Sequence, residues 1–143
     1  MSVQSEYERW LNSTKVSLKD KEILRSLSKE EIDDAFFKNI DFGTAGMRGI
    51  LGPGTNRMNE FTVRKATIAY AKYLLEKYED VQTRGVVIAH DNRHFSREFT
   101  LATAEVLNLF GIRAFLFDSL RPTPELSYAV RKLNACGGIV ITA

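Results

Sequence analysis

The 143-residue chain has the length of one ordinary domain, long enough to bury a hydrophobic core without disulfide bonds or metal ions. Apolar residues make up 44% of it and charged residues 27%, and no apolar run approaches the roughly 18 residues of a membrane span, which excludes disordered and membrane-spanning classes. Residues 1–42 carry seven Lys/Arg and nine Asp/Glu, a charge of −2, and residues 43–143 carry thirteen and nine, a charge of +4. The basic residues are scattered, which suits a phosphorylated small molecule at least as well as a nucleic acid. Because the start is polar and acidic, unlike a signal peptide, we expect a cytoplasmic protein.

The first 40 residues are predicted to form a helical extension. A helix beginning near Ser5 would place three large apolar side chains on one face: Tyr7, Trp10 and Leu11. Ser17 is expected to cap a second helix, because a serine hydroxyl can accept hydrogen bonds from the unpaired N–H groups of a first turn. Ser28 and Glu31 have the spacing of a capping box, so a third helix is expected after Ser28.

Glycine dominates the next stretch, because five of the nine glycines in the chain lie between Gly43 and Gly54. A segment this rich in glycine cannot be a regular helix and is predicted to be loop or short strand. Beyond it, helical and β-type segments alternate: a helix over 62–78, an apolar run over 85–89, a helix over 96–110, a β-type run over 114–117, a helix over 123–133 and a final apolar run over 138–142.

This alternation predicts the fold class. Continuous apolar strands separated by helices are typical of a largely parallel sheet with helices on both faces. We therefore expect a three-layer α/β/α domain over residues 41–143, with a mostly parallel sheet of four strands. The helical extension over residues 1–40 precedes it.

The richest chemistry lies in residues 41–52, called here the glycine–arginine segment. Glycine stands at every third position from Gly43 to Gly52, so backbone amides can approach an anion, and Arg48 offers a planar fork of donors that suits phosphate. Thr44 adds a hydroxyl group. This combination indicates a phosphate or phosphosugar site. On spacing alone, a loop whose glycines only permit tight turns, with Arg48 solvated, explains it equally well.

Two familiar phosphate-binding motifs are missing from the sequence. There is no glycine–lysine pair, as a Walker loop needs, and no Gly-x-Gly-x-x-Gly pattern, because Arg57 stands where the last glycine would be. ATPase and dehydrogenase interpretations lose their main support. Arg57 itself adds a second cation close behind the glycines, although a surface loop explains it as well.

A second polar cluster, over residues 90–96, stands where the apolar run over 85–89 ends and a helix begins. Ligands bind at the carboxyl ends of strands in α/β sheets, which makes Asp91 and Arg93 candidates by position. These two can equally pair with each other or cap the helix, and we favour that structural role. Metal binding is disfavoured for the two histidines of the cluster, which lack partners at ligand spacing: His90 and His94.

Three separated stretches carry a family resemblance. Residues 42–49 read Phe-Gly-Thr-Ala-Gly-Met-Arg-Gly, Asp91-Asn92-Arg93 is followed by Ser96, and Pro122-Thr123-Pro124 precedes the run over 137–143. The first resembles the Phe-Gly-Thr-Ser/Ala-Gly-x-Arg segment of the α-D-phosphohexomutase superfamily, and the second resembles its Asp-x-Arg-x-Ser stretch. The third resembles the approach to the active-site loop of that superfamily. The helical extension and the stretch Asn56-Arg57-Met58-Asn59 look most like the branch of phosphoglucomutases and phosphopentomutases found in many bacteria and animals.

The resemblance implies the first domain of a four-domain enzyme whose active site lies in a central cleft. It also implies a mixed sheet, in which one strand can run antiparallel. The family's active-site loop reads Thr-Ala-Ser-His-Asn-Pro, so the nucleophilic serine would come next after Thr142-Ala143. The phosphoserine would pass its phosphoryl group to glucose 1-phosphate, giving glucose 1,6-bisphosphate. That intermediate would return the other phosphoryl group and leave glucose 6-phosphate.

The resemblance further implies roles for five residues of this chain. Arg48, helped by Thr44, would bind the phosphoserine, and three residues would support its loop: Asp91, Arg93 and Thr142. Mg²⁺ would neutralise charge during transfer, with ligands mostly outside this chain. The expected partners are a sugar phosphate and the remaining domains of the same polypeptide, and the chain alone is expected to be inactive.

Several alternatives stay open from the sequence. A phosphomannomutase or phosphopentomutase of the same superfamily is the alternative to a phosphoglucomutase. A stand-alone module could hold phosphosugars such as glucose 1,6-bisphosphate without turning them over. A basic nucleic-acid binder would show an affinity that falls with salt.

Overall fold

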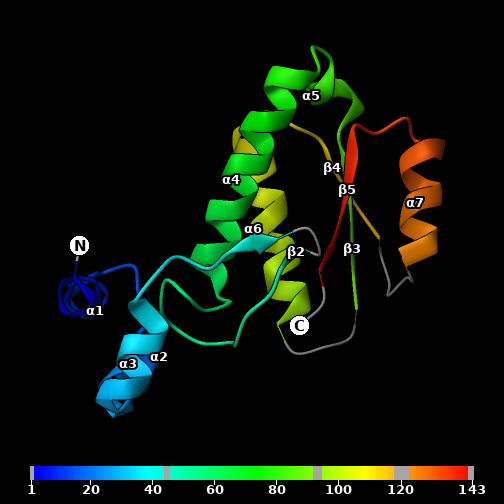
Figure 1. The fold of residues 1–143 in the computed structure, drawn as a ribbon. Coiled ribbons are helices and arrows are strands. Elements are labelled where there is room, and N and C mark those ends of the chain that lie inside the picture. Colours follow the sequence, from blue (N-terminus) through cyan, green and yellow to red (C-terminus); the bar gives the residue numbers. More distant parts are fainter. Residues whose placement is uncertain (1, 44–45, 92–94, 118–122, 142–143) are drawn as a thin grey trace. The chain divides into compact units, whose positions relative to one another are not determined.

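The structure, a computed structural model, describes residues 2–43, 46–91, 95–117 and 123–141 (Figure 1). The chain divides into two compact units, Met1–Thr62 and Val63–Ala143, each with a hydrophobic cluster of its own. The domain boundary expected between residues 40 and 41 rests on sequence pattern and stays a prediction. Over the described ranges, no helix is both long enough and apolar enough to span a membrane.

The first unit begins with three helices: α1 (Val3–Asn12), α2 (Leu18–Ser26) and α3 (Lys29–Phe36). Ser17 and Ser28 cap α2 and α3 as predicted, and Ser28 with Glu31 forms a complete capping box. The predicted start of α1 near Ser5 was wrong. Its N-cap is Ser2, because the Ser2 hydroxyl accepts the backbone N–H of Ser5 at 3.1 Å.

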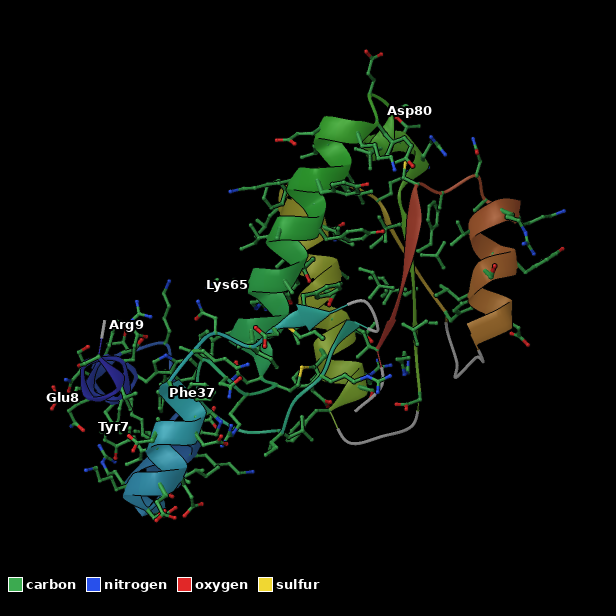
Figure 2. The ribbon with its side chains drawn as sticks, in the orientation of Figure 1. Tyr7, Glu8, Arg9, Phe37, Lys65 and Asp80 are labelled. Atoms are coloured by element: carbon green, nitrogen blue, oxygen red, sulfur yellow. The ribbon has the colours of Figure 1, made fainter. Side chains whose placement is uncertain are left out.

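The three helices surround an aromatic cluster. Trp10 meets Phe36 edge-on at 5.7 Å between ring centroids, and Phe61 meets Trp10 in the same way at 5.3 Å. Tyr7 projects from α1 towards the other helices and donates a hydrogen bond to the carbonyl of Leu24, whereas Glu8 points away from them (Figure 2). The predicted apolar face of the first helix is therefore the face that packs.

After α3 come two very short strands, β1 (Phe42–Gly43) and β2 (Gly46–Met47), which pair antiparallel. The glycine-rich stretch is thus short strand and loop, as predicted. A long helix, α4 (Glu60–Lys77), follows. A four-residue helix, α5 (Val81–Arg84), comes next and was not predicted, because one turn leaves no periodic pattern to read.

The second unit contains a parallel sheet of three strands in the order β4-β3-β5, formed by β3 (Val86–His90), β4 (Ala114–Leu116) and β5 (Gly137–Ile141). Two helices connect them, α6 (Ser96–Leu109) and α7 (Thr123–Lys132). The predicted α/β/α class is confirmed. Within the described residues the sheet has three strands where four were expected, and all three run parallel.

Helices cover both faces of this sheet, with α4 and α6 on one side and α7 on the other (Figure 1). Two consecutive glycines in β5 permit the close approach. A Cβ at Gly137 would collide with the hydroxyl of Tyr70 on α4, and a Cβ at Gly138 would lie 2.9 Å from Cγ2 of Val130 on α7. Successive strand residues point to opposite faces, so the glycine pair makes room for one helix on each face.

Candidate functional site

The glycine–arginine segment exposes bare backbone at two of its glycines. Gly46 has φ +96 and Gly52 has φ +151, conformations that a side chain disfavours. Among the described atoms, none lies within 4 Å of the place that a Cβ would take at either residue. The backbone is therefore uncovered on its Cβ side at both positions, although the N–H of Gly52 is already donated to the carbonyl of Met58.

Gly49 is glycine for a different reason. A Cβ there would lie 2.6 Å from Cδ1 of Ile40 and 3.7 Å from Cγ of Met58. This glycine lets the segment lie against residues that precede and follow it. The regular spacing of glycines in the sequence thus has two causes, open backbone at Gly46 and Gly52 and close packing at Gly49.

Arg48 directly follows β2 and is exposed. In the parts of the chain that the structure describes, its guanidinium has neither a hydrogen bond nor an ion pair. Its five N–H donors are therefore available to an anion or to water. Exposure of this kind fits both interpretations of the sequence, a phosphate ligand and a solvated side chain.

Arg57, the second arginine near the glycines, has a structural partner. Its Nη2 lies 2.7 Å from Oδ2 of Asp34, and its side chain is only 13% exposed. The same guanidinium donates to the backbone carbonyls of Asp34 and Asn56. Arg57 thus ties the chain behind the glycines to the end of α3, and it is not a free cation for a ligand.

Asn59, to which the sequence interpretation gave no role, makes several hydrogen bonds behind the segment. Its side-chain Nδ2 donates to the carbonyls of Gly52 and Gly54, each at 2.9 Å. Its Oδ1 accepts the backbone N–H of Thr62, and its own N–H donates to the Thr62 hydroxyl. The sequence does hold a signal for the two hydrogen bonds between Asn59 and Thr62, because these residues have the spacing of an N-cap and the third residue of a helix.

In the second unit, Asp91 connects the ends of three elements. Its carboxylate Oδ1 accepts the hydroxyl of Ser96, a fully buried residue at the start of α6, at 2.7 Å. Its backbone N–H donates to the carbonyl of Ile141 at the end of β5, at 3.1 Å. Nδ1 of His90 lies 2.9 Å from the carbonyl of Asp91, so that nitrogen carries the proton. Asp91 therefore joins β3, β5 and α6.

Three predicted site residues lie outside the described residues, and the structure gives no geometry for them: Thr44, Arg93 and Thr142. His94, for which metal binding was disfavoured, lies outside them too. Arg48 belongs to the first unit and Asp91 to the second. The roles predicted for all of these residues stay predictions.

The described residues do not fit a resident Mg²⁺ site. Across the described ranges, no three side chains of His, Cys, Asp or Glu gather closely enough to hold a metal ion. The carboxylate of Asp91 is engaged by Ser96, and that of Asp34 by Arg57. That the ligands of Mg²⁺ lie mostly outside this chain stays a prediction.

Comparison with known proteins gives consistent matches. Residues 39–143 match the protein family described as phosphoglucomutase/phosphomannomutase, alpha/beta/alpha domain I. The chain is 41% identical over 138 residues to a phosphoglucomutase of Staphylococcus aureus (strain USA300), covering 95% of this chain and 24% of that protein. It is 35% identical over 150 residues to a phosphopentomutase of Homo sapiens, covering 99% and 24%. A phosphopentomutase of Mus musculus is 34% identical over 145 residues, covering 97% and 23%.

The chain thus spans about a quarter of the length of the curated relatives it matches. No solved structure matches it significantly.

Proposed function

Because this chain belongs to the phosphoglucomutase/phosphomannomutase family, we propose that it is the N-terminal part of a mutase that interconverts glucose 1-phosphate and glucose 6-phosphate. The reaction would proceed through a phosphoserine and a glucose 1,6-bisphosphate intermediate. The observation that carries the proposal is the family match over residues 39–143, which contains the open, arginine-bearing glycine segment.

Arg48 is the residue of this chain that we assign to phosphate. Phosphoryl transfer depends mainly on positioning and on neutralising charge, and a guanidinium can donate two parallel hydrogen bonds to one phosphate group. The exposed Arg48 supplies such donors, and the empty space where a Cβ would stand at Gly46 leaves room for an anion beside the segment. In the proposal the Thr44 hydroxyl adds another donor, and the phosphate is the one on the serine expected after Ala143.

Asp91 is assigned to support of the loop that carries the serine. Its hydrogen bonds to Ser96 and to the carbonyl of Ile141 support this assignment, since Ile141 immediately precedes Thr142 in the sequence. In the proposal Arg93 and Thr142 act with it, and none of the three takes part in bond making. When bound, Mg²⁺ would supply charge neutralisation at the transferring group, with ligands from the remaining polypeptide.

Substrate preference is the finer part of the proposal. Identity to the phosphoglucomutase of S. aureus is 41%, against 34–35% to the phosphopentomutases, which favours glucose phosphates. The phosphopentomutases match over 97–99% of this chain, so a pentose phosphate is the second candidate. The values of kcat/KM for glucose, mannose and ribose 1-phosphates with the full-length protein decide between them. A higher value for mannose or ribose would replace the glucose assignment.

The role of Arg48 is tested by Arg48→Ala in the full-length protein. Loss of a donor to the transferring group is expected to lower kcat by about 10²- to 10³-fold. Arg48→Lys keeps the charge without the planar fork, so its kcat is expected to lie between that of the wild type and that of Arg48→Ala. Arg25→Ala is the matched control, because Arg25 is another exposed arginine of the first unit. Unchanged turnover in Arg48→Ala would overturn the assignment.

Tight binding of glucose 1,6-bisphosphate with no turnover by the wild type would indicate a binding module instead.

A further inference from the structure

The side-chain amide of Asn59 makes two distinct sets of contacts. Oδ1 accepts the backbone N–H of Thr62 at 3.0 Å and so caps α4. Nδ2 donates to the carbonyl of Gly52, the last residue of the glycine–arginine segment, and to that of Gly54, two residues beyond it. The oxygen therefore serves the helix, while the nitrogen serves the segment.

The nitrogen contacts add to the few contacts that fix the backbone at Gly52. Gly52 has no side chain, has φ +151, and has open space where a Cβ would be. Glycine loses more conformational freedom on ordering than any other residue, so such a position needs external contacts to keep one conformation. Nδ2 of Asn59 supplies one of these contacts at Gly52, and the hydrogen bond from the Gly52 N–H to the carbonyl of Met58, at 3.1 Å, supplies another.

Backbone contacts link the residue before Asn59 to the residues that follow Arg48. The N–H of Met58 donates to the carbonyl of Ile50 at 2.8 Å, two residues after Arg48. Leu51 forms a β-bridge with Met58, the residue before Asn59. Behind them, Arg57 is held by the carboxylate of Asp34. The stretch from Ile50 to Gly54, which begins two residues after Arg48, is thus fastened on one side to residues 57–59.

We infer that Asn59 is a positioning residue for Arg48: its Nδ2, by holding the carbonyls of Gly52 and Gly54, fixes the segment from which the phosphate-binding guanidinium projects. This inference rests on the function proposed for Arg48. A small displacement of a group that stabilises a transition state costs rate even when the fold is intact, because catalytic donors act only at short range.

Asn59→Asp tests the role of the side-chain nitrogen separately from that of the oxygen. The carboxylate keeps the oxygen that caps α4, and Asp is as good an N-cap as Asn. It loses both donors and places negative charge against two carbonyl oxygens. In the full-length enzyme, we expect kcat with glucose 1-phosphate to fall about tenfold, while KM stays within about twofold. A wild-type kcat in Asn59→Asp would overturn the inference.

Two further variants control for folding. Asn59→Ser also keeps a capping oxygen, but without the charge and without the reach to both carbonyls, so it is expected to lower kcat in the same way. Ser17→Ala removes the cap of α2, a helix that makes no hydrogen bond to the described residues of the segment, and should leave kcat unchanged. A fall of kcat in Ser17→Ala equal to that in the Asn59 variants would mean that lost caps alone reduce activity, which would also overturn the inference.

A double-mutant cycle with Arg48→Ala separates this inference from the proposed function. If Asn59 acts through Arg48, Asn59→Asp costs little further rate once Arg48 is gone. Two effects that simply multiply would overturn the positioning role and leave the proposed function standing. Full activity of Arg48→Ala would overturn the phosphate-binding role proposed for Arg48, and the positioning role with it.

Discussion

Two glycines behind Arg48, Gly52 and Gly54, show how differently the same residue type can be constrained. Both have positive φ, at +151 and +136. Around Gly52 the space for a Cβ is open, whereas at Gly54 a Cβ would lie 2.7 Å from the carbonyl oxygen of Ala35 and 3.0 Å from its Cβ. Gly54 therefore carries both a conformational and a packing constraint, and Gly52 carries only the first.

Alanine substitutions at these two positions are expected to differ in stability. Gly54→Ala should lower the free energy of unfolding by about 3 kcal/mol, since backbone strain and a clash with rigid backbone add together. Gly52→Ala should cost about 1 kcal/mol, from strain alone. Urea denaturation followed by circular dichroism measures both. Equal losses in the two variants would contradict the close packing of Gly54 against Ala35.

Which residues of the candidate site can be named from the sequence depends on how far apart in the sequence their contacts lie. Arg48 could be named from the sequence because the chemistry of guanidinium and glycine is local to one segment. The ion pair between Arg57 and Asp34 joins residues 23 positions apart, and no local pattern encodes such a pair. The contacts of Asn59 with Gly52 and Gly54 depend on a turn whose path the sequence does not specify.

At the scale of elements, α1 is held by its apolar face, of which Trp10 is the buried member. Trp10 is 8% exposed and meets Phe36 and Phe61 edge-on, with Tyr7 beside it. An isolated ten-residue helix is marginal in water, so α1 depends on this packing for its stability. The helical extension is thus part of the core of the first unit.

Trp10→Ala is expected to destabilise the chain by about 3–5 kcal/mol, because it removes the largest buried ring of the cluster and leaves a cavity. Trp10→Phe keeps an aromatic ring and should lose less. Leu18→Ala is the control, since Leu18 is 78% exposed, and it should change stability by no more than about 0.5 kcal/mol. Thermal unfolding monitored by circular dichroism measures all three. A Trp10→Ala variant as stable as Leu18→Ala would show that the cluster is not what holds α1.

Elements with local signals were predictable, and elements without them were not. The caps at Ser17 and Ser28 and the alternation of helices with apolar strands rest on short spacings, and the structure confirms them. The start of α1 was placed at Ser5 because Ser2 lies ahead of the apolar pattern. The number of strands in a sheet depends on pairings between distant segments, which periodicity does not report.

At the scale of the whole molecule, charge argues for a small anionic partner. The net charge is only +2, and residues 43–143 hold thirteen basic residues against nine acidic ones. Binding to nucleic acid draws on many phosphate contacts at once, and its affinity then falls steeply with salt. One exposed arginine beside bare glycine backbone suits a single phosphate group instead.

An activity assay of the 143 residues alone tests whether this chain holds the whole active site or only its phosphate-binding part. Phosphoryl transfer needs a nucleophile, a positioned sugar and a neutralised phosphate together, and removing any one leaves little rate. The chain supplies Arg48 for the phosphate, while the proposed serine, the Mg²⁺ ligands and the sugar-binding loops are expected elsewhere in the polypeptide. We expect the isolated chain, shown to be folded by circular dichroism, to form no glucose 6-phosphate from glucose 1-phosphate in the presence of glucose 1,6-bisphosphate and Mg²⁺. The full-length protein assayed alongside is the positive control. Turnover by the isolated chain would mean that its own residues complete the active site, and the assignment of the nucleophile to the residue after Ala143 would have to be abandoned.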